Sequence, residues 1–170
     1  QSSPVVSSAD KIIAAARKAG VNKLDYVLIT HYHVDHVGGL GELISKFPVE
    51  TILDHGPNRE VLDPNSRTPV AMQPASLYVE YERTIAGHQR KSLKTGDKVQ
   101  LGSVMLTAAI SDGEVPKTPP PEAGQAIAEC ASMTEKADNG GEENERSLGI
   151  LLTYGKARVV ALGDLTWNME

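Results

Sequence analysis

Residues 25–39 read DYVLITHYHVDHVGG, an apolar run followed at once by a dense cluster of polar side chains. The run Tyr26–Thr30 is apolar and β-branched over the length of a strand, so we expect a buried β-strand there. Four side chains that commonly bind metals follow where this strand stops, and two glycines come next: His31, His33, Asp35, His36, Gly38 and Gly39.

The spacing of these side chains suits metal binding. Residues i and i+2 of an extended chain point to one face, so His31 and His33 can reach one cation. A turn after them lets Asp35 and His36 reach a second. Imidazole nitrogen and carboxylate oxygen suit Zn²⁺ first, and Fe or Mn next. Surface histidines at a strand end are the alternative, but three of the chain's five histidines fall in this short window.

This pattern carries a family resemblance. His31-x-His33-x-Asp35-His36 after an apolar strand, followed by Gly38-Gly39, resembles the HxHxDH signature of the metallo-β-lactamase superfamily. Within it, the wider context most resembles the soluble domain of the ComEC/Rec2 DNA-uptake proteins and their free-standing bacterial relatives. The resemblance implies an α/β fold, the αββα sandwich of that superfamily. It also implies a single domain, residues 1–170, that lacks the first strands and the C-terminal part.

Further ligands follow from the resemblance. Asp164 comes after Gly163 at a strand end, where the family places an aspartate that bridges two metals. From the sequence alone, that position is a common place for a turn residue. Many family members carry a third histidine for the first metal where this chain has Asp112, so Asp112 could substitute as an oxygen ligand.

A second histidine follows a second predicted strand, Val49–Leu53. His55 stands next to Asp54, and parallel strands would bring it to the same rim as His31. We therefore expect His55 either to line the site or to orient a metal ligand. A turn with a solvated histidine is the alternative interpretation, and the sequence does not separate the two.

The rest of the chain alternates helices and strands. Ser7 predicts the N-cap of a helix that ends near Gly20, and a short helix is expected over Leu40–Phe47. A longer helix is expected over Ala75–Lys91. Two hairpins should turn at Gly102-Ser103 and Gly155-Lys156. Residues 114–145 are rich in Pro, Gly and acidic side chains, which predicts a surface insertion that could act as a lid.

Composition limits the partners. The formal net charge of −5 gives no general attraction to nucleic acid, although a local basic groove would be compatible with it. No apolar run is long enough to cross a bilayer, and residues 1–10 lack the pattern of a signal peptide. We expect a soluble globular unit, while the compartment and the oligomeric state are not fixed by the sequence.

The leading hypothesis is metal-dependent hydrolysis at two zinc ions, which would activate water against a carbonyl or phosphoryl group. Asp35 would be the catalytic residue that orients the attacking hydroxide. The resemblance favours a phosphodiester substrate, with a lactam, thioester or lactone as alternatives. Two rivals come from other classes: a di-iron redox protein with the same ligands, and a non-catalytic metal-binding module.

Overall fold

The computed structural model describes residues 6–118, 128, 142–166 and 169. The chain divides into two compact units, Gln1–Leu93 and Lys94–Glu170, and each is described by itself. Most of the expected insertion over residues 114–145 lies outside the described residues. Its role as a lid therefore stays a prediction.

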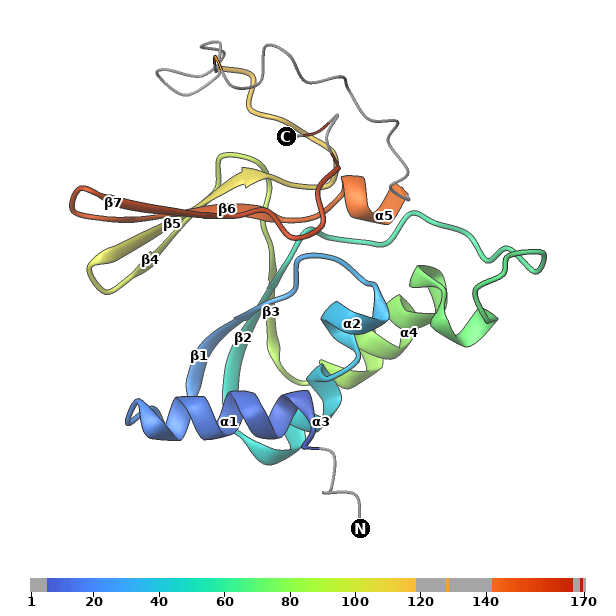
Figure 1. Cartoon of the computed structure of the whole chain (residues 1–170), viewed down its shortest axis with the longest axis horizontal. Coiled ribbons are helices and arrows are strands. Elements are labelled where there is room, and N and C mark those ends of the chain that lie inside the picture. Colours follow the sequence, from blue (N-terminus) through green and yellow to red (C-terminus); the bar gives the residue numbers. More distant parts are fainter. Residues whose placement is uncertain (1–5, 119–127, 129–141, 167–168, 170) are drawn as a thin grey trace. The chain divides into compact units, whose positions relative to one another are not determined.

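The first unit alternates helices with parallel strands (Figure 1). Its elements in chain order are α1 (Ser8–Lys18), β1 (Leu24–Leu28), α2 (Val34–Val37), α3 (Leu40–Lys46), β2 (Val49–Asp54), the 3₁₀ helix η1 (Val70–Met72), α4 (Pro74–Thr84) and β3 (Gln89–Ser92). The strands lie in the order β1-β2-β3, and both neighbouring pairs are parallel. Parallel strands end at one edge of their sheet, so the segments that follow β1 and β2 leave from the same edge.

Local signals explain where α1 and α4 begin and end. The Ser7 side chain accepts a hydrogen bond from the backbone N–H of Asp10 at 3.1 Å, which is the expected N-cap of α1. Pro74 occupies the first turn of α4, where a missing N–H costs nothing. The helix stops ten residues later at Thr84, and Gly87 follows with a φ of 91°. The predicted helix over Ala75–Lys91 is thus too long, because Gln89–Ser92 pairs with β2 instead.

Other boundaries differ by a few residues. The expected strand Tyr26–Thr30 is observed as β1 over Leu24–Leu28, because its pairing with β2 begins at Leu24 opposite Val49. The backbone N–H of Ile29 still donates to Leu53 O at 2.8 Å, so the chain continues alongside β2 before it turns. The helix expected over Leu40–Phe47 is confirmed as α3.

Helices bury apolar side chains against this sheet. One cluster joins α1 to α3, with Ala9, Ile13, Leu43 and Phe47. The other includes Tyr81 of α4 and the residue that follows this helix, Ile85, which pack with Ile29, Tyr32 and Ile52. Burial of such side chains is the main stabilising term of the unit.

A buried carboxylate lies at the end of β2. Asp54 is 0% exposed, and each of its two carboxylate oxygens accepts two hydrogen bonds. Gly56 N and Ser92 Oγ donate to Oδ1 at 2.9 and 2.6 Å, while Tyr81 Oη and Arg90 Nε donate to Oδ2 at 2.5 and 2.6 Å. The carboxylate therefore ties β2 to β3, to α4 and to the loop that follows β2. We call this set of residues the Asp54 network.

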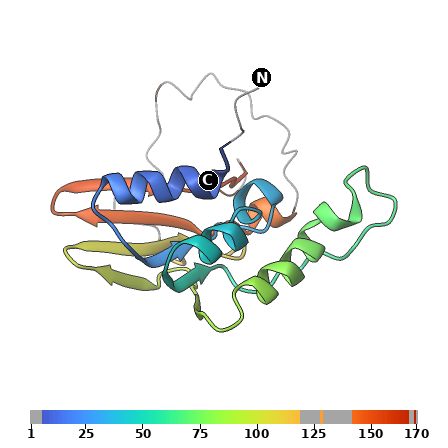
Figure 2. The same cartoon turned by 90° about the horizontal axis from the view of Figure 1, so that it is seen from below.

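The second unit is an antiparallel sheet, whose two hairpins are visible in Figure 2. Its strands are β4 (Lys98–Leu101), β5 (Val104–Ile110), β6 (Gly149–Tyr154) and β7 (Ala157–Ala161), and the short helix α5 (Glu142–Glu145) precedes β6. Gly102 and Gly155 have φ angles of 60° and 55° at the two hairpin turns. Both predicted hairpins are confirmed, since tight turns of this kind need a residue that tolerates positive φ.

We predict that Asp54→Asn lowers the free energy of unfolding by about 3 kcal/mol, because it leaves the Arg90 guanidinium without its buried counter-charge. Urea unfolding followed by circular dichroism measures this. Asp25→Asn is the control, since that carboxylate is 63% exposed and pairs with Lys23 at the surface, where a pair is worth about 0–1 kcal/mol. Equal stability of the two variants would contradict the role given to Asp54.

Candidate metal centre

His31 and His33 follow β1 and approach each other closely. His31 Nε2 lies 3.0 Å from His33 Nδ1, and the two rings meet edge to face with centroids 4.8 Å apart. Two nitrogens that bind one tetrahedral Zn²⁺ at 2.0–2.1 Å lie about 3.3 Å from each other. The observed separation is thus within a few tenths of an ångström of what a shared metal requires.

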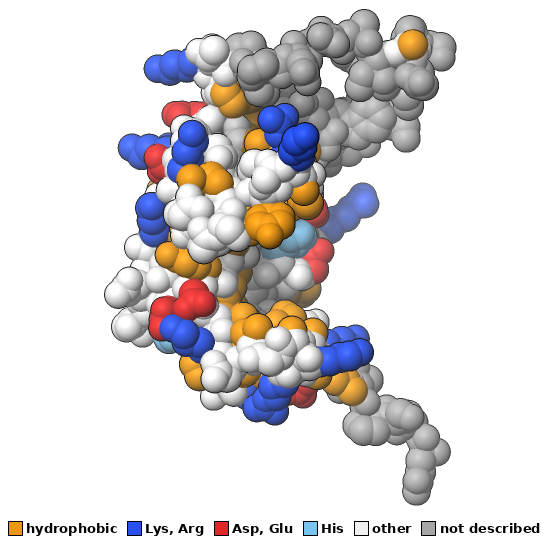
Figure 3. All heavy atoms as spheres, turned by 90° about the vertical axis from the view of Figure 1, so that its left-hand side faces the viewer, with side chains coloured by type: hydrophobic (Ala, Val, Ile, Leu, Met, Phe, Trp, Pro, Cys, Tyr) orange, Lys and Arg blue, Asp and Glu red, His pale blue; other side chains and the backbone are white. Residues whose placement is uncertain are grey.

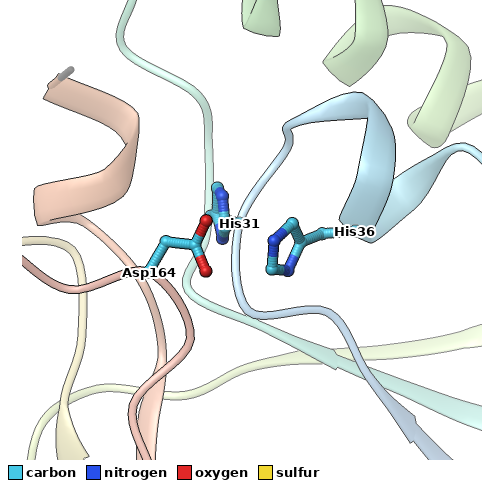
Figure 4. Close-up of side chains that lie close together, drawn as sticks. All are labelled: His31, His36 and Asp164. Atoms are coloured by element: carbon cyan, nitrogen blue, oxygen red, sulfur yellow. The ribbon is translucent and has the colours of Figure 1, made fainter. Parts of the chain in front are cut away.

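His36 joins this pair from α2. Figure 4 shows the rings of His31 and His36 side by side, with centroids 4.0 Å apart. Thr30 Oγ1 lies 3.1 Å from His31 Nδ1 and 3.2 Å from His36 Nδ1, so one hydroxyl contacts both rings. A hydroxyl can donate to one nitrogen and accept from the other. This arrangement occupies both Nδ1 atoms, so a metal at this site would be bound through the Nε2 atoms.

Asp35 points away from the interior. Its side chain is 73% exposed, and Oδ2 lies 3.6 Å from Nε2 of the adjacent His36. That separation is close to what two ligands of one cation require. His31, by contrast, is completely buried. The segment therefore holds one pair of nitrogens that begins at the buried His31 and includes the half-buried His33, and one more exposed pair of ligand atoms, on Asp35 and His36.

The donor set fits a divalent metal. Three imidazoles and one carboxylate come from a single short segment, and Thr30 orients two of the rings, as the outer partners of metal-bound histidines commonly do. Imidazole-rich sites of this kind are typical of Zn²⁺.

His55 lies in the loop after β2, as predicted, and it is 4% exposed. The alternative interpretation of a solvated histidine is therefore wrong. Its ring contacts Tyr32, with centroids 4.8 Å apart. Because Tyr32 lies between His31 and His33 in the sequence, His55 packs against the segment that carries the candidate ligands.

The two candidates in the second unit lie in turns. Asp112 has a φ of 52°, and its Oδ1 accepts a hydrogen bond from Arg146 Nη1 at 2.8 Å. This ion pair gives the Asp112 carboxylate a structural partner that a metal would have to displace. Asp164 follows Gly163, whose φ is 64°, in an exposed turn after β7. Its role as a bridging ligand stays a prediction.

Sequence reasoning missed three parts of this site. Thr30 was expected only as the end of a strand, Tyr32 carried no prediction, and the link from Asp54 to Arg90 spans 36 residues. The position of Thr30 directly before the first histidine was the one signal that could have been used. No sequence spacing indicates the other two.

The surface in Figure 3 shows Lys and Arg side chains interspersed with Asp and Glu on the face that it displays. This mixture is in keeping with the net charge of −5. Among the described residues, no helix is both long and apolar enough to cross a membrane.

We predict that Gly38→Ala weakens binding at the more exposed ligand pair. A Cβ at Gly38 would overlap the carbonyl oxygen of Val34, so α2 must shift and carry His36 with it. We expect a loss of stability of about 1–3 kcal/mol, measured by thermal unfolding, together with a lower metal content. Gly39→Ala is the matched control, because a Cβ there would lie 3.8 Å from the nearest atom, Ser8 Cβ. Similar behaviour of both variants would refute the steric argument.

Relatives of known function share short stretches with this chain. A hydroxyacylglutathione hydrolase of Rhodopseudomonas palustris (strain HaA2) is 41% identical over 56 residues, which cover 33% of this chain and 22% of the relative. One of Vibrio cholerae (strain M66-2) is 46% identical over 41 residues, 24% of this chain and 16% of the relative. A ribonuclease Z of Methanopyrus kandleri is 31% identical over 99 residues, 56% of this chain and 30% of the relative. The aligned parts thus span less than a third of these relatives, and the expected kinship with DNA-uptake proteins stays a prediction.

Among solved structures, that of CmlA, a diiron beta-hydroxylase from Streptomyces venezuelae, aligns with a TM-score of 0.38 and 16% identity. The alignment covers 84% of this chain and 20% of CmlA, and a likeness this weak says nothing about the metal or the activity. The family model described as the metallo-beta-lactamase superfamily matches residues 4–170. With an α/β fold and a histidine cluster after the first strand, the chain belongs to the metallo-β-lactamase superfamily.

Proposed function

We propose that this protein is a metal-dependent hydrolase. The observation that carries the proposal is the 3.0 Å separation between His31 Nε2 and His33 Nδ1, in a segment where Thr30 orients the neighbouring rings. A distance of 3.0 Å is also the length of a hydrogen bond between two imidazoles. A metal is favoured because Thr30 contacts Nδ1 of both His31 and His36, as the outer partner of metal-binding histidines commonly does.

Each ligand has a proposed place. His31 and His33 hold the first metal, while Asp35 and His36 hold the second. Asp164 supplies the bridging carboxylate that the family resemblance implies. Bound zinc would lower the pKa of water toward neutrality and polarise the scissile carbonyl or phosphoryl group.

Asp35 is the proposed catalytic residue. Its carboxylate is 73% exposed, so water and substrate can reach it without a rearrangement of the buried His31. A carboxylate oxygen at this position would accept a hydrogen bond from the attacking water and fix the direction of the lone pair that attacks. The same carboxylate can accept the proton that the water loses.

Two substrate classes are supported by relatives. The ribonuclease Z match covers the larger share of this chain, which favours a phosphodiester. The hydroxyacylglutathione hydrolase matches are shorter but more identical, which favours a thioester as the second candidate. The net charge of −5 argues against a long polyanion unless a local basic surface receives it.

Metal content is the first test of this proposal. Elemental analysis of protein purified without chelator should give close to two zinc or manganese ions per chain, and His31→Ala should lower that content because it removes one of the paired nitrogens. His88→Ala is the control, since that histidine lies outside the segment. Two irons together with a flavin-binding partner would support the redox alternative. Metal that can be neither found nor restored would favour the non-catalytic module, in which the motif is retained but binds metal poorly.

The catalytic role of Asp35 gives a separate prediction. We expect Asp35→Asn to lower kcat by about 10²-fold or more, because the amide cannot take a proton from water. Hydrolysis of an RNA phosphodiester and of a hydroxyacyl thioester of glutathione should be assayed in parallel. Asp25→Asn, on an exposed position of β1, should leave both rates unchanged. Undiminished turnover by Asp35→Asn would remove Asp35 from the mechanism.

A further inference from the structure

Tyr32 lies between the two paired histidines and on the opposite side of the chain. Alternation along an extended segment sends His31 and His33 to one face and the residue between them to the other. Tyr32 is 0% exposed, and its ring contacts three others, those of His55, Tyr78 and Tyr81, at centroid distances of 4.8, 4.7 and 5.0 Å. The segment that carries the two metal-binding nitrogens is thus anchored from behind by an aromatic cluster.

The Tyr32 hydroxyl adds a directional anchor. It donates a hydrogen bond to the carbonyl oxygen of Gly56 at 2.5 Å, in the loop after β2. This bond joins the segment after β1 to the segment after β2, at the edge where both strands end. Packing of an aromatic ring is not strongly directional, so the ring alone could shift relative to its neighbours. A hydrogen bond from its hydroxyl to one acceptor fixes the position of the ring along its long axis.

The acceptor itself is held in place by the Asp54 network. Gly56 N donates to Asp54 Oδ1 at 2.9 Å, and Arg90 Nη2 lies 3.4 Å from Gly56 O. Gly56 has a φ of 103°, a conformation that side-chain-bearing residues rarely adopt. The carbonyl that Tyr32 uses therefore has a fixed orientation.

We propose that Tyr32 is a positioning residue that keeps His31 and His33 at the spacing needed to bind one metal ion. This inference rests on the proposed function, since it concerns the same pair of nitrogens. The Tyr32 side chain packs against His55, Tyr78 and Tyr81, so its action on the metal would be indirect. Holding this side chain at Gly56 O fixes the backbone from which His31 and His33 extend.

The test compares two tyrosines of the same cluster. Tyr32→Phe keeps the ring and removes the bond to Gly56 O, while Tyr81→Phe removes another buried hydroxyl, which donates to Asp54 Oδ2. Arg90 still donates to Oδ2 in Tyr81→Phe, and Gly56 N is bound by the other oxygen, Oδ1, so the acceptor of Tyr32 keeps its place. The probe is Zn²⁺, titrated in competition with a chromophoric chelator. We expect Tyr32→Phe to raise the zinc dissociation constant about tenfold, the size typical of lost outer-shell contacts, and Tyr81→Phe to stay close to the wild type.

Two further readouts separate positioning from stability. Thermal unfolding of the metal-free variants should show similar losses, because each lacks one buried hydrogen bond. The visible spectrum of Co²⁺ bound in place of zinc reports ligand geometry, and it should change in Tyr32→Phe alone. If Tyr32→Phe proves too unstable, Gly56→Ala displaces the acceptor instead, since its φ of 103° disfavours a Cβ, and it should weaken zinc binding in the same way.

Unchanged zinc affinity in Tyr32→Phe, beside tight binding by the wild type, would overturn this inference and leave the proposed function standing. An equal loss in Tyr81→Phe would also overturn it, because the effect would then belong to the cluster as a whole. Absence of zinc binding by the wild type would overturn both the proposed function and this inference.

Discussion

The first unit depends on a carboxylate that has no access to water. Asp54 is completely buried, and the energetic cost of removing its charge from solvent must be offset by partners at close range. Arg90, Tyr81, Ser92 and the Gly56 N–H supply them, from β3, α4 and the loop after β2. Because an unpaired buried charge is so unfavourable, these elements have essentially one arrangement in which they can pack together.

Aromatic side chains connect the Asp54 network to residues 30–36, which carry the candidate ligands. Arg90 lies over the rings of Tyr78 and Tyr81, at 5.7 and 5.5 Å from their centroids. Burial, reinforced by the nearby Asp54 charge, raises the pKa of the Tyr32 and Tyr81 hydroxyls well above the ordinary tyrosine value. Both hydroxyls therefore keep their protons and act as donors at any physiological pH. A chain of fixed hydrogen bonds thus runs from the interior to the backbone between His31 and His33.

The site combines a rigid half with an accessible half. His31 and Tyr32 are buried and His33 is half-buried, whereas Asp35 and His36 lie on the single turn of α2, with Asp35 exposed. Such a division suits a hydrolase, in which one metal can be fixed while water and substrate approach the other. Gly38 permits the tight end of α2, because a Cβ at this position would overlap Val34 O in the first turn of the same helix.

The sequence by itself determined the family, the strand before the histidines, the N-cap of α1 and both hairpins. Each of these is a local pattern: a ligand motif of six residues, a run of β-branched side chains, or a pair of turn residues between apolar runs. The sequence-based prediction placed the end of α4 too late. Gln89–Ser92 has helical spacing of apolar residues before it, but these four residues pair with β2 and form a strand.

Only the tertiary structure decided what surrounds the ligands. Tyr81 and Arg90 lie 27 and 36 residues after Asp54 in the chain. Contacts between residues this far apart produce no periodic pattern in a single sequence. The burial of His55 and the bond from Tyr32 to Gly56 likewise depend on how parallel strands bring their ends to one edge. The local sequence pattern identified the candidate ligands, because it is six residues long. The distances between their atoms depend on packing between segments that are far apart in the chain.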